Sequence, residues 1–116
     1  MRLKARIPRK KIQSLLRNLK TYDPERVILF GSSASGSADR YSDLDIVVIK
    51  ETSKRFVERL REVAVLLPDT FDVDTFVYTP EEWERMIQAG NPIASRVLKE
   101  GVTIYERTEA RGRKVA

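Results

Sequence analysis

The sequence of 116 residues contains 22 Lys and Arg against 17 Asp and Glu, which gives a formal net charge of +5. It contains no cysteine and no histidine, which excludes disulfide bridges, zinc–thiolate sites, thiolate nucleophiles and serine–histidine catalysis. Any metal ion must therefore be held by oxygen ligands, a donor set that favours Mg²⁺, with Mn²⁺ as a substitute.

The apolar runs of the sequence are short. None approaches the ~20 residues that a membrane-spanning helix needs, and the basic N-terminal stretch is not followed by the apolar core of a signal peptide. We therefore expect a cytoplasmic protein of one domain. The positive charge would help to gather a nucleotide or an acidic partner. Because the basic residues are scattered along the chain, direct nucleic-acid binding is not expected.

Helix and strand signals alternate along the chain. Ile12, Leu15 and Leu19 recur at helical spacing, which predicts a first amphipathic helix. Thr79 and Glu82 form a capping box, which predicts the start of a later helix. By such signals we expect helices at residues 8–20, 54–67, 80–89 and 91–98, and strands at 26–30, 43–49, 71–78 and 102–105.

The order of these elements predicts an α+β domain at 1–106, with a mixed sheet of about four strands flanked by helices. A flexible charged tail is expected at 107–116. The second helix is expected to begin after a cap at Thr52 or Ser53. Its buried stripe should consist of apolar residues at helical spacing, namely Phe56, Leu60, Val63 and Leu67.

The stretch from residue 27 to 48 contains most of the candidate catalytic residues. An apolar strand stops at Gly31 and Ser32, and ten residues later Asp43 and Asp45 open a second apolar run. Two carboxylates two residues apart on a strand point to the same face, with Cα atoms roughly 6.5 Å apart. They can converge on two metal ions about 3.5–4 Å apart, the arrangement used in phosphoryl chemistry. Gly31 and Ser32 offer backbone N–H groups and a hydroxyl to phosphate oxygens.

A third carboxylate is expected from the strand at 71–78. The strands at 43–49 and 71–78 are joined by a helix, so they should be parallel in a right-handed β–α–β unit. The strand at 26–30 enters the site from its C-terminal end and should lie antiparallel to its neighbour. This arrangement brings an early acid of the strand at 71–78, either Asp72 or Asp74, beside the first two carboxylates.

The pattern of Gly31-Ser32, ten residues, then Asp43-x-Asp45 resembles the signature of the nucleotidyltransferase superfamily. That superfamily contains DNA polymerase β, kanamycin nucleotidyltransferase and the minimal nucleotidyltransferase (MNT) proteins of prokaryotes. The chain length and the stretch from Val73-Asp74 to the Thr-Pro-Glu-Glu helix start look most like the MNT group. In that group an acid after valine on a strand leads to such a helix, so the resemblance favours Asp74 over Asp72.

The resemblance implies a role for each of these residues. Asp43 and Asp45 would hold two Mg²⁺ ions, and Asp74 would bind the ion that activates an acceptor hydroxyl, as its base or by orienting it. Gly31 and Ser32 would cradle the triphosphate of ATP. The acceptor would attack the α-phosphorus, take up AMP and release pyrophosphate.

In the MNT group the partner is commonly a HEPN-domain toxin, and some members neutralise it by adenylylating one of its tyrosines, others by binding. The resemblance therefore implies an adenylyltransferase antitoxin of a type VII-like toxin–antitoxin pair, with a tyrosine of the toxin as the acceptor. Many MNT proteins carry a basic residue where this chain has Ser35, unless Arg40 takes its place. That departure keeps open a binding module that neutralises a partner without useful turnover. A further alternative is a nucleotidyltransferase for a small molecule or nucleic acid, whose acceptor cleft forms in a homo-oligomer.

Overall fold

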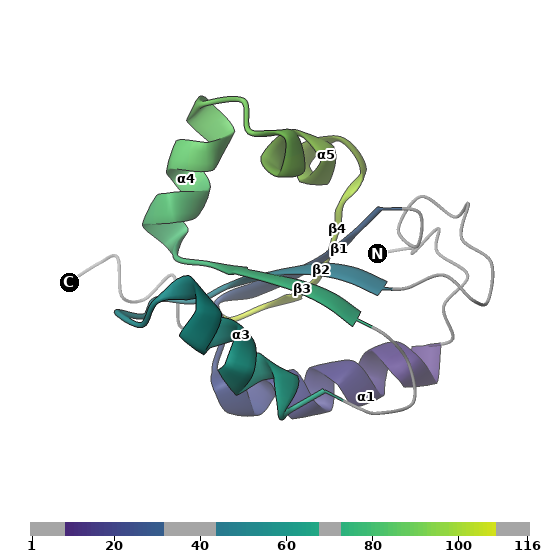
Figure 1. Ribbon diagram of the computed structural model, residues 1–116. Coiled ribbons are helices and arrows are strands. Elements are labelled where there is room, and N and C mark those ends of the chain that lie inside the picture. Colours follow the sequence, from purple (N-terminus) through teal and green to yellow (C-terminus); the bar gives the residue numbers. More distant parts are fainter. Residues whose placement is uncertain (1–8, 32–43, 68–72, 109–116) are drawn as a thin grey trace.

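The computed structural model describes residues 9–31, 44–67 and 73–108, which form one mixed sheet with helices on both faces (Figure 1). The strands are β1 (Arg26–Phe30), β2 (Leu44–Ile49), β3 (Val73–Tyr78) and β4 (Val102–Glu106). The helices are α1 (Arg9–Leu19), α3 (Phe56–Ala64), α4 (Pro80–Gln88) and α5 (Pro92–Glu100), with a 3₁₀ turn η1 at Lys20–Tyr22. Within this described part, no helix is long and apolar enough to cross a membrane.

The sheet has the strand order β3-β2-β1-β4. β1 is antiparallel to both β2 and β4, and β2 is parallel to β3. The expected α+β class, the parallel pair and the antiparallel first strand are therefore confirmed. Some expected elements begin or end outside the described residues: residue 8 of the first helix, Asp43 of the second strand, residues 71–72 of the third strand, and most of the charged tail, 109–116.

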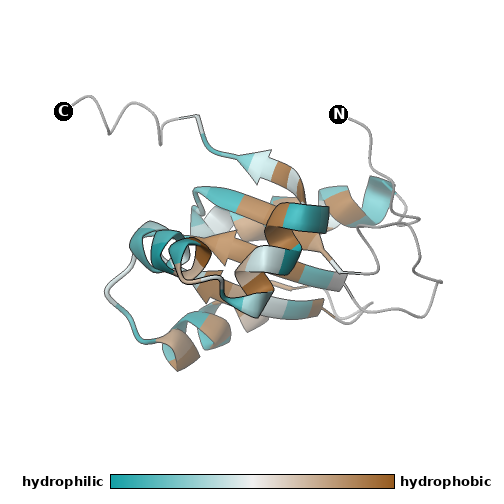
Figure 2. Cartoon of the chain, turned by 90° about the horizontal axis from the view of Figure 1, so that it is seen from above, coloured by the Kyte–Doolittle hydropathy of each residue, from teal (hydrophilic) through white to brown (hydrophobic). Residues whose placement is uncertain are grey.

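Each face of the sheet is covered by a pair of helices, as Figure 1 shows with α1 and α3 on one side and α4 and α5 on the other. In Figure 2 the strands carry most of the hydrophobic colour, while the helices alternate between hydrophobic and hydrophilic. Central strand β2 is buried on both faces, which explains its continuous aliphatic run. The core under α1 and α3 contains Leu15, Leu19, Val27, Leu29, Ile46, Val48, Val63 and Val77. The core under α4 and α5 contains Ile28, Phe30, Val47, Ile49, Trp83, Ala94 and Val97.

Helix α3 differs from its prediction in start and in buried face. Its N-cap is Arg55, in an extended conformation, and the Thr52 hydroxyl accepts a hydrogen bond from the backbone N–H of Lys54 instead (3.1 Å). Phe56, which was expected to be buried, is 38% exposed, whereas Arg59 is 6% exposed. The prediction was wrong here because apolar periodicity assigns an arginine to the solvent face.

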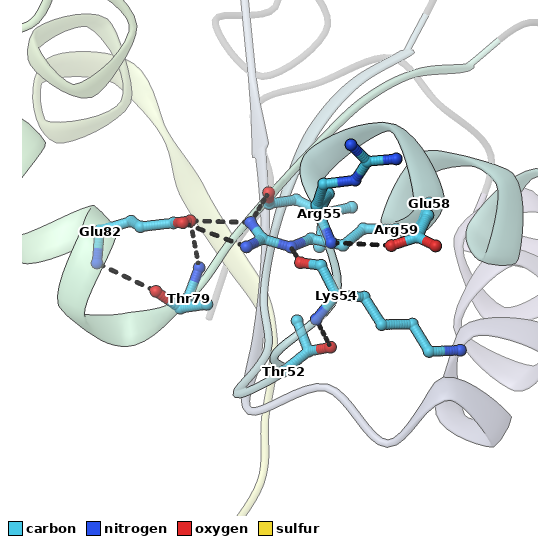
Figure 3. A network of polar contacts seen from close by, with 8 residues as sticks. Thr52, Lys54, Arg55, Glu58, Arg59, Thr79 and Glu82 are labelled. Carbon is cyan, nitrogen blue, oxygen red and sulfur yellow. Dashed lines mark hydrogen bonds and ion pairs between the residues drawn. The ribbon is translucent and has the colours of Figure 1, made fainter.

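The buried Arg59 joins α3 to β3 and α4 (Figure 3). Its guanidinium donates two hydrogen bonds to the Glu82 carboxylate (2.8 and 3.1 Å) and one to the carbonyl of Val77 (3.2 Å). Its Nε donates to the carbonyl of Lys54 (2.8 Å). Glu82 also closes the predicted capping box by accepting from the Thr79 backbone N–H (3.0 Å), while the Thr79 hydroxyl accepts from Glu82 N–H (3.1 Å). These paired bonds satisfy a charge that would otherwise be costly to bury.

Both ends of helix α5 are fixed by local contacts. The Asn91 side chain accepts from the backbone N–H groups of Ile93 (2.8 Å) and Ala94 (3.3 Å), so it caps the helix start. At the other end a Cβ on Gly101 would lie 2.5 Å from the carbonyl oxygen of Val97. Only glycine permits this close approach of the chain to the helix.

We expect Glu82→Gln to lower the free energy of unfolding by about 1–2 kcal/mol at pH 7, because it weakens charge-assisted bonds to a buried guanidinium. The Arg59 hydrogen bonds hold the pKa of Glu82 below its ordinary value. The stabilisation from its carboxylate is therefore complete above the unfolded-state pKa of about 4.5 and is lost as the pH falls through the lower folded-state pKa. Urea unfolding between pH 3 and 7 measures the difference.

Glu81→Gln is the matched control, because its ion pair with Arg85 is exposed (3.5 Å) and should contribute less than about 0.5 kcal/mol. Equal urea midpoints for the two variants at pH 7 would contradict the role given to Arg59 and Glu82.

Candidate active site

The ends of strands β1, β2 and β3 lie side by side at one end of the sheet (Figure 1). Because β1 runs antiparallel to β2, and β2 parallel to β3, the C-terminal end of β1 lies beside the N-terminal ends of the other two. Phe30 pairs with Asp45, and Asp45 pairs with Asp74. Neighbouring strands are about 4.8 Å apart, so the two carboxylates start from adjacent backbone positions on one face. Asp45 is half-buried and Asp74 is exposed.

Gly31 directly follows β1 and lies against the Asp45 carboxylate. Its φ of +82° lies in the left-handed region, where a side chain is strained. A Cβ at this position would overlap Asp45 Oδ2 and lie 3.3 Å from the carboxylate carbon. The sequence suggested that glycine is needed for approach to a phosphate. The structure adds a second reason, which is that the Asp45 carboxylate packs directly on the glycine backbone.

A cation that the sequence did not reveal lies at the same point. Nη2 of Arg96, from α5, is 3.4 Å from the position that a Gly31 Cβ would occupy. The guanidinium carbon lies 5.5 Å from the centroid of the Phe30 ring, and Nη2 contacts the Glu100 carboxylate at 3.4 Å. No local motif marks Arg96 in the sequence, because its nearness to Gly31 arises only when α5 packs on β1.

The structure describes three of the predicted site residues, Gly31, Asp45 and Asp74, and brings them together. Ser32 and Asp43 lie outside the described residues, as do the alternative acid Asp72 and the loop positions Ser35 and Arg40. Within residues 9–31, 44–67 and 73–108, no three acidic side chains gather closely enough to hold a metal ion. The two described carboxylates are nevertheless oxygen donors on adjacent strands, which is the donor chemistry that Mg²⁺ prefers. Their part in metal binding stays a prediction.

A cavity of about 690 Å³ lies away from these carboxylates. Phe56, Tyr78 and Met86 are among its lining residues. Tyr78 is at the opposite end of β3 from Asp74, about 13 Å along the strand at 3.3 Å per residue. This cavity therefore does not belong to the site at Gly31, Asp45 and Asp74.

Residues 10–110 match the protein family described as Polymerase beta, Nucleotidyltransferase, and the chain belongs to this family. Over 85 residues, 70% of the chain, it is 32% identical to a Methanocaldococcus jannaschii protein that bears the name protein adenylyltransferase MJ1305. The chain spans 58% of the length of that relative.

Solved structures share the fold. A Sulfolobus solfataricus structure described as a nucleotidyltransferase has a TM-score of 0.53 at 22% identity, covering 88% of this chain and 92% of that one. A toxin–antitoxin structure with AMP-PNP has a TM-score of 0.56 at 20% identity, covering 87% and 77%. A mutant of the toxin–antitoxin MntA-HpeT has a TM-score of 0.55 at 22% identity, covering 93% and 80%. These likenesses confirm the expected nucleotidyltransferase fold.

Gly31→Ala tests the packing of Asp45 on the glycine. We expect a loss of about 1–2 kcal/mol of folding free energy from the left-handed backbone and, in addition, displacement of the Asp45 carboxylate by the new methyl group. Mn²⁺ affinity, measured by calorimetry, should therefore fall with the mutation. Gly90→Ala is the control, because Gly90 also has a positive φ (+71°) but its Cβ would meet nothing within 4 Å. The same Mn²⁺ affinity in both variants would contradict the packing argument.

Proposed function

We propose that this chain is a Mg²⁺-dependent adenylyltransferase that transfers AMP from ATP to a hydroxyl group on a partner protein, a tyrosine of a HEPN-domain toxin. The observation that carries the proposal is the pairing of Asp45 with Asp74 at the sheet edge where Gly31 ends β1. Membership of the nucleotidyltransferase family supports the reaction class. The name of the Methanocaldococcus relative and the AMP-PNP in one toxin–antitoxin structure support a protein acceptor and ATP as donor.

The carboxylates would act through the metal they hold. Asp45 and Asp74, with Asp43 as the third predicted ligand, supply oxygen donors for Mg²⁺. When bound, Mg²⁺ would neutralise the triphosphate, stabilise the departing pyrophosphate and make the acceptor hydroxyl a better nucleophile. In the transfer, the acceptor oxygen forms a bond to the α-phosphorus, the bond from that phosphorus to the pyrophosphate oxygen breaks, and the hydroxyl proton passes to a carboxylate or to water.

The exposure of the two acids suggests how donor and acceptor would be divided. Asp45 is half-buried against the Gly31 backbone, whereas Asp74 is exposed on β3, which is an outer strand of the sheet. We assign the triphosphate to the Gly31 side and the acceptor hydroxyl to Asp74. On this assignment Asp74 would orient the hydroxyl or accept its proton, and the acceptor would arrive from another molecule. An antitoxin that modifies its toxin partner fits this arrangement.

The test uses ATP labelled at the α-phosphate, Mg²⁺ and an extract of the source cell. We expect a labelled protein band with the wild-type chain, whose mass identifies the acceptor. Asp45→Asn and Asp74→Asn should each reduce labelling at least about 100-fold, because metal stabilisation of transition-state charge is worth several kcal/mol. Glu84→Gln, an exposed acid on α4, is the control and should leave labelling unchanged.

Three outcomes would change the proposal. Label in a small-molecule or nucleic-acid fraction would keep the enzyme but move its acceptor. Capture of a partner protein without any labelling would favour a binding module, which the serine at position 35 keeps open. Loss of labelling in Asp72→Asn but not in Asp74→Asn would transfer the third-carboxylate role to Asp72.

A further inference from the structure

We propose that Arg96 is a triphosphate-binding residue, whose guanidinium exchanges the Glu100 carboxylate for phosphate oxygens when ATP enters the site. This inference rests on the proposed function. It adds a positively charged residue of α5 to a site whose other predicted residues lie in the strands or directly next to them.

Position is the first argument. Arg96 Nη2 and Asp45 Oδ2 both approach the point where a Gly31 side chain would begin, the nitrogen at 3.4 Å. A phosphate approaching the Gly31 backbone would therefore come within reach of the guanidinium. It would also meet the negative charges of Asp45 and Asp74, so a fixed cation at this point lowers the electrostatic cost of bringing the triphosphate in.

Preorganisation is the second argument. The residues two before and one after Arg96 in the helix, Ala94 and Val97, are 0% and 5% exposed and pack in the core with Phe30. The Arg96 guanidinium carbon lies 5.5 Å from the centroid of the Phe30 ring, which places the side chain along β1. The helix itself is capped by Asn91. Arg96 is thus presented by a rigid element, which favours precise binding.

The present partner of Arg96 is weak and easily replaced. Its contact with Glu100 is 3.4 Å long, and the two side chains are 57% and 31% exposed. Solvent-exposed pairs four residues apart on a helix contribute little. A guanidinium binds phosphate through two parallel charge-assisted hydrogen bonds, which are stronger. The triphosphate would therefore displace Glu100 rather than compete with a firm ion pair.

The test measures ATP affinity of the full chain by calorimetry in Mg²⁺. We expect Arg96→Ala to weaken ATP binding on the order of 10- to 100-fold, the loss that follows removal of hydrogen bonds to a charged group. Arg96→Lys should recover only part of the affinity, because lysine keeps the charge without the fork of donors. Glu100→Gln should leave ATP binding as tight as in the wild type or tighten it about twofold, since it removes the competing carboxylate.

Arg85→Ala is the matched control. Arg85 is exposed and pairs with Glu81 four residues away, as Arg96 does with Glu100, but it lines the distant cavity. Thermal unfolding should be unchanged in both arginine variants. In the labelling assay Arg96→Ala should raise the KM for ATP, an effect that a purely structural role would not produce without loss of stability.

The two proposals fail in different ways. Wild-type ATP affinity in Arg96→Ala would overturn the role of Arg96, whether or not the wild-type chain transfers label. Binding that depends on Arg96 without transfer to any acceptor would overturn the proposed reaction and leave the role of Arg96 standing. A wild-type chain that binds no ATP would overturn both.

Discussion

The register of β2 is the constraint on which the rest of the structure depends. One alignment, antiparallel to β1 and parallel to β3, places Asp45 opposite both Phe30 and Asp74. Because side chains alternate between faces, a slip of one residue would turn Asp45 into the core under α1 and α3. Such a slip would also exchange the two faces of the strand, so that Ile46 and Val48 would enter the core that now packs around Val47 and Ile49, and the reverse. The packing of the aliphatic residues of β2 therefore fixes its register, and the register places Asp45 beside Gly31 and Asp74.

The polar bonds that fix β3 lie at the other end of the sheet. Arg59 ties α3 to the end of β3 and to the first turn of α4 through Val77 and Glu82. This closes the β–α–β unit and holds the strand that carries Asp74. The charges that support the fold are thus separated from the charges of the site by about the length of a strand. Substitutions in one set should affect stability, and those in the other should affect binding.

Local signals predicted most of the fold. β1 was placed residue for residue, and the capping box at Thr79 located the start of α4. The chirality of the β–α–β unit predicted that Asp72 or Asp74 lies beside the first two acids, and the family resemblance favoured Asp74, which pairs with Asp45 in the structure. The failures are tertiary in origin. Arg59 finds its carboxylate on a different helix, so hydropathy could not mark it as buried, and the approach of Arg96 to Gly31 depends on how α5 packs on β1.

The site residues become more exposed to solvent from Gly31 to Asp74, and this order bears on the kind of acceptor that the site would serve. Gly31 is buried, Asp45 is half-buried, and Asp74 is exposed. On the two proposals above, the chain would build the nucleotide side from its own packed elements, with Arg96 supplying a positive charge beside Gly31. The described residues leave the acceptor side open at Asp74. An acceptor bound at such an edge would have to bring its own recognition surface, which a folded protein partner offers and a small metabolite does not.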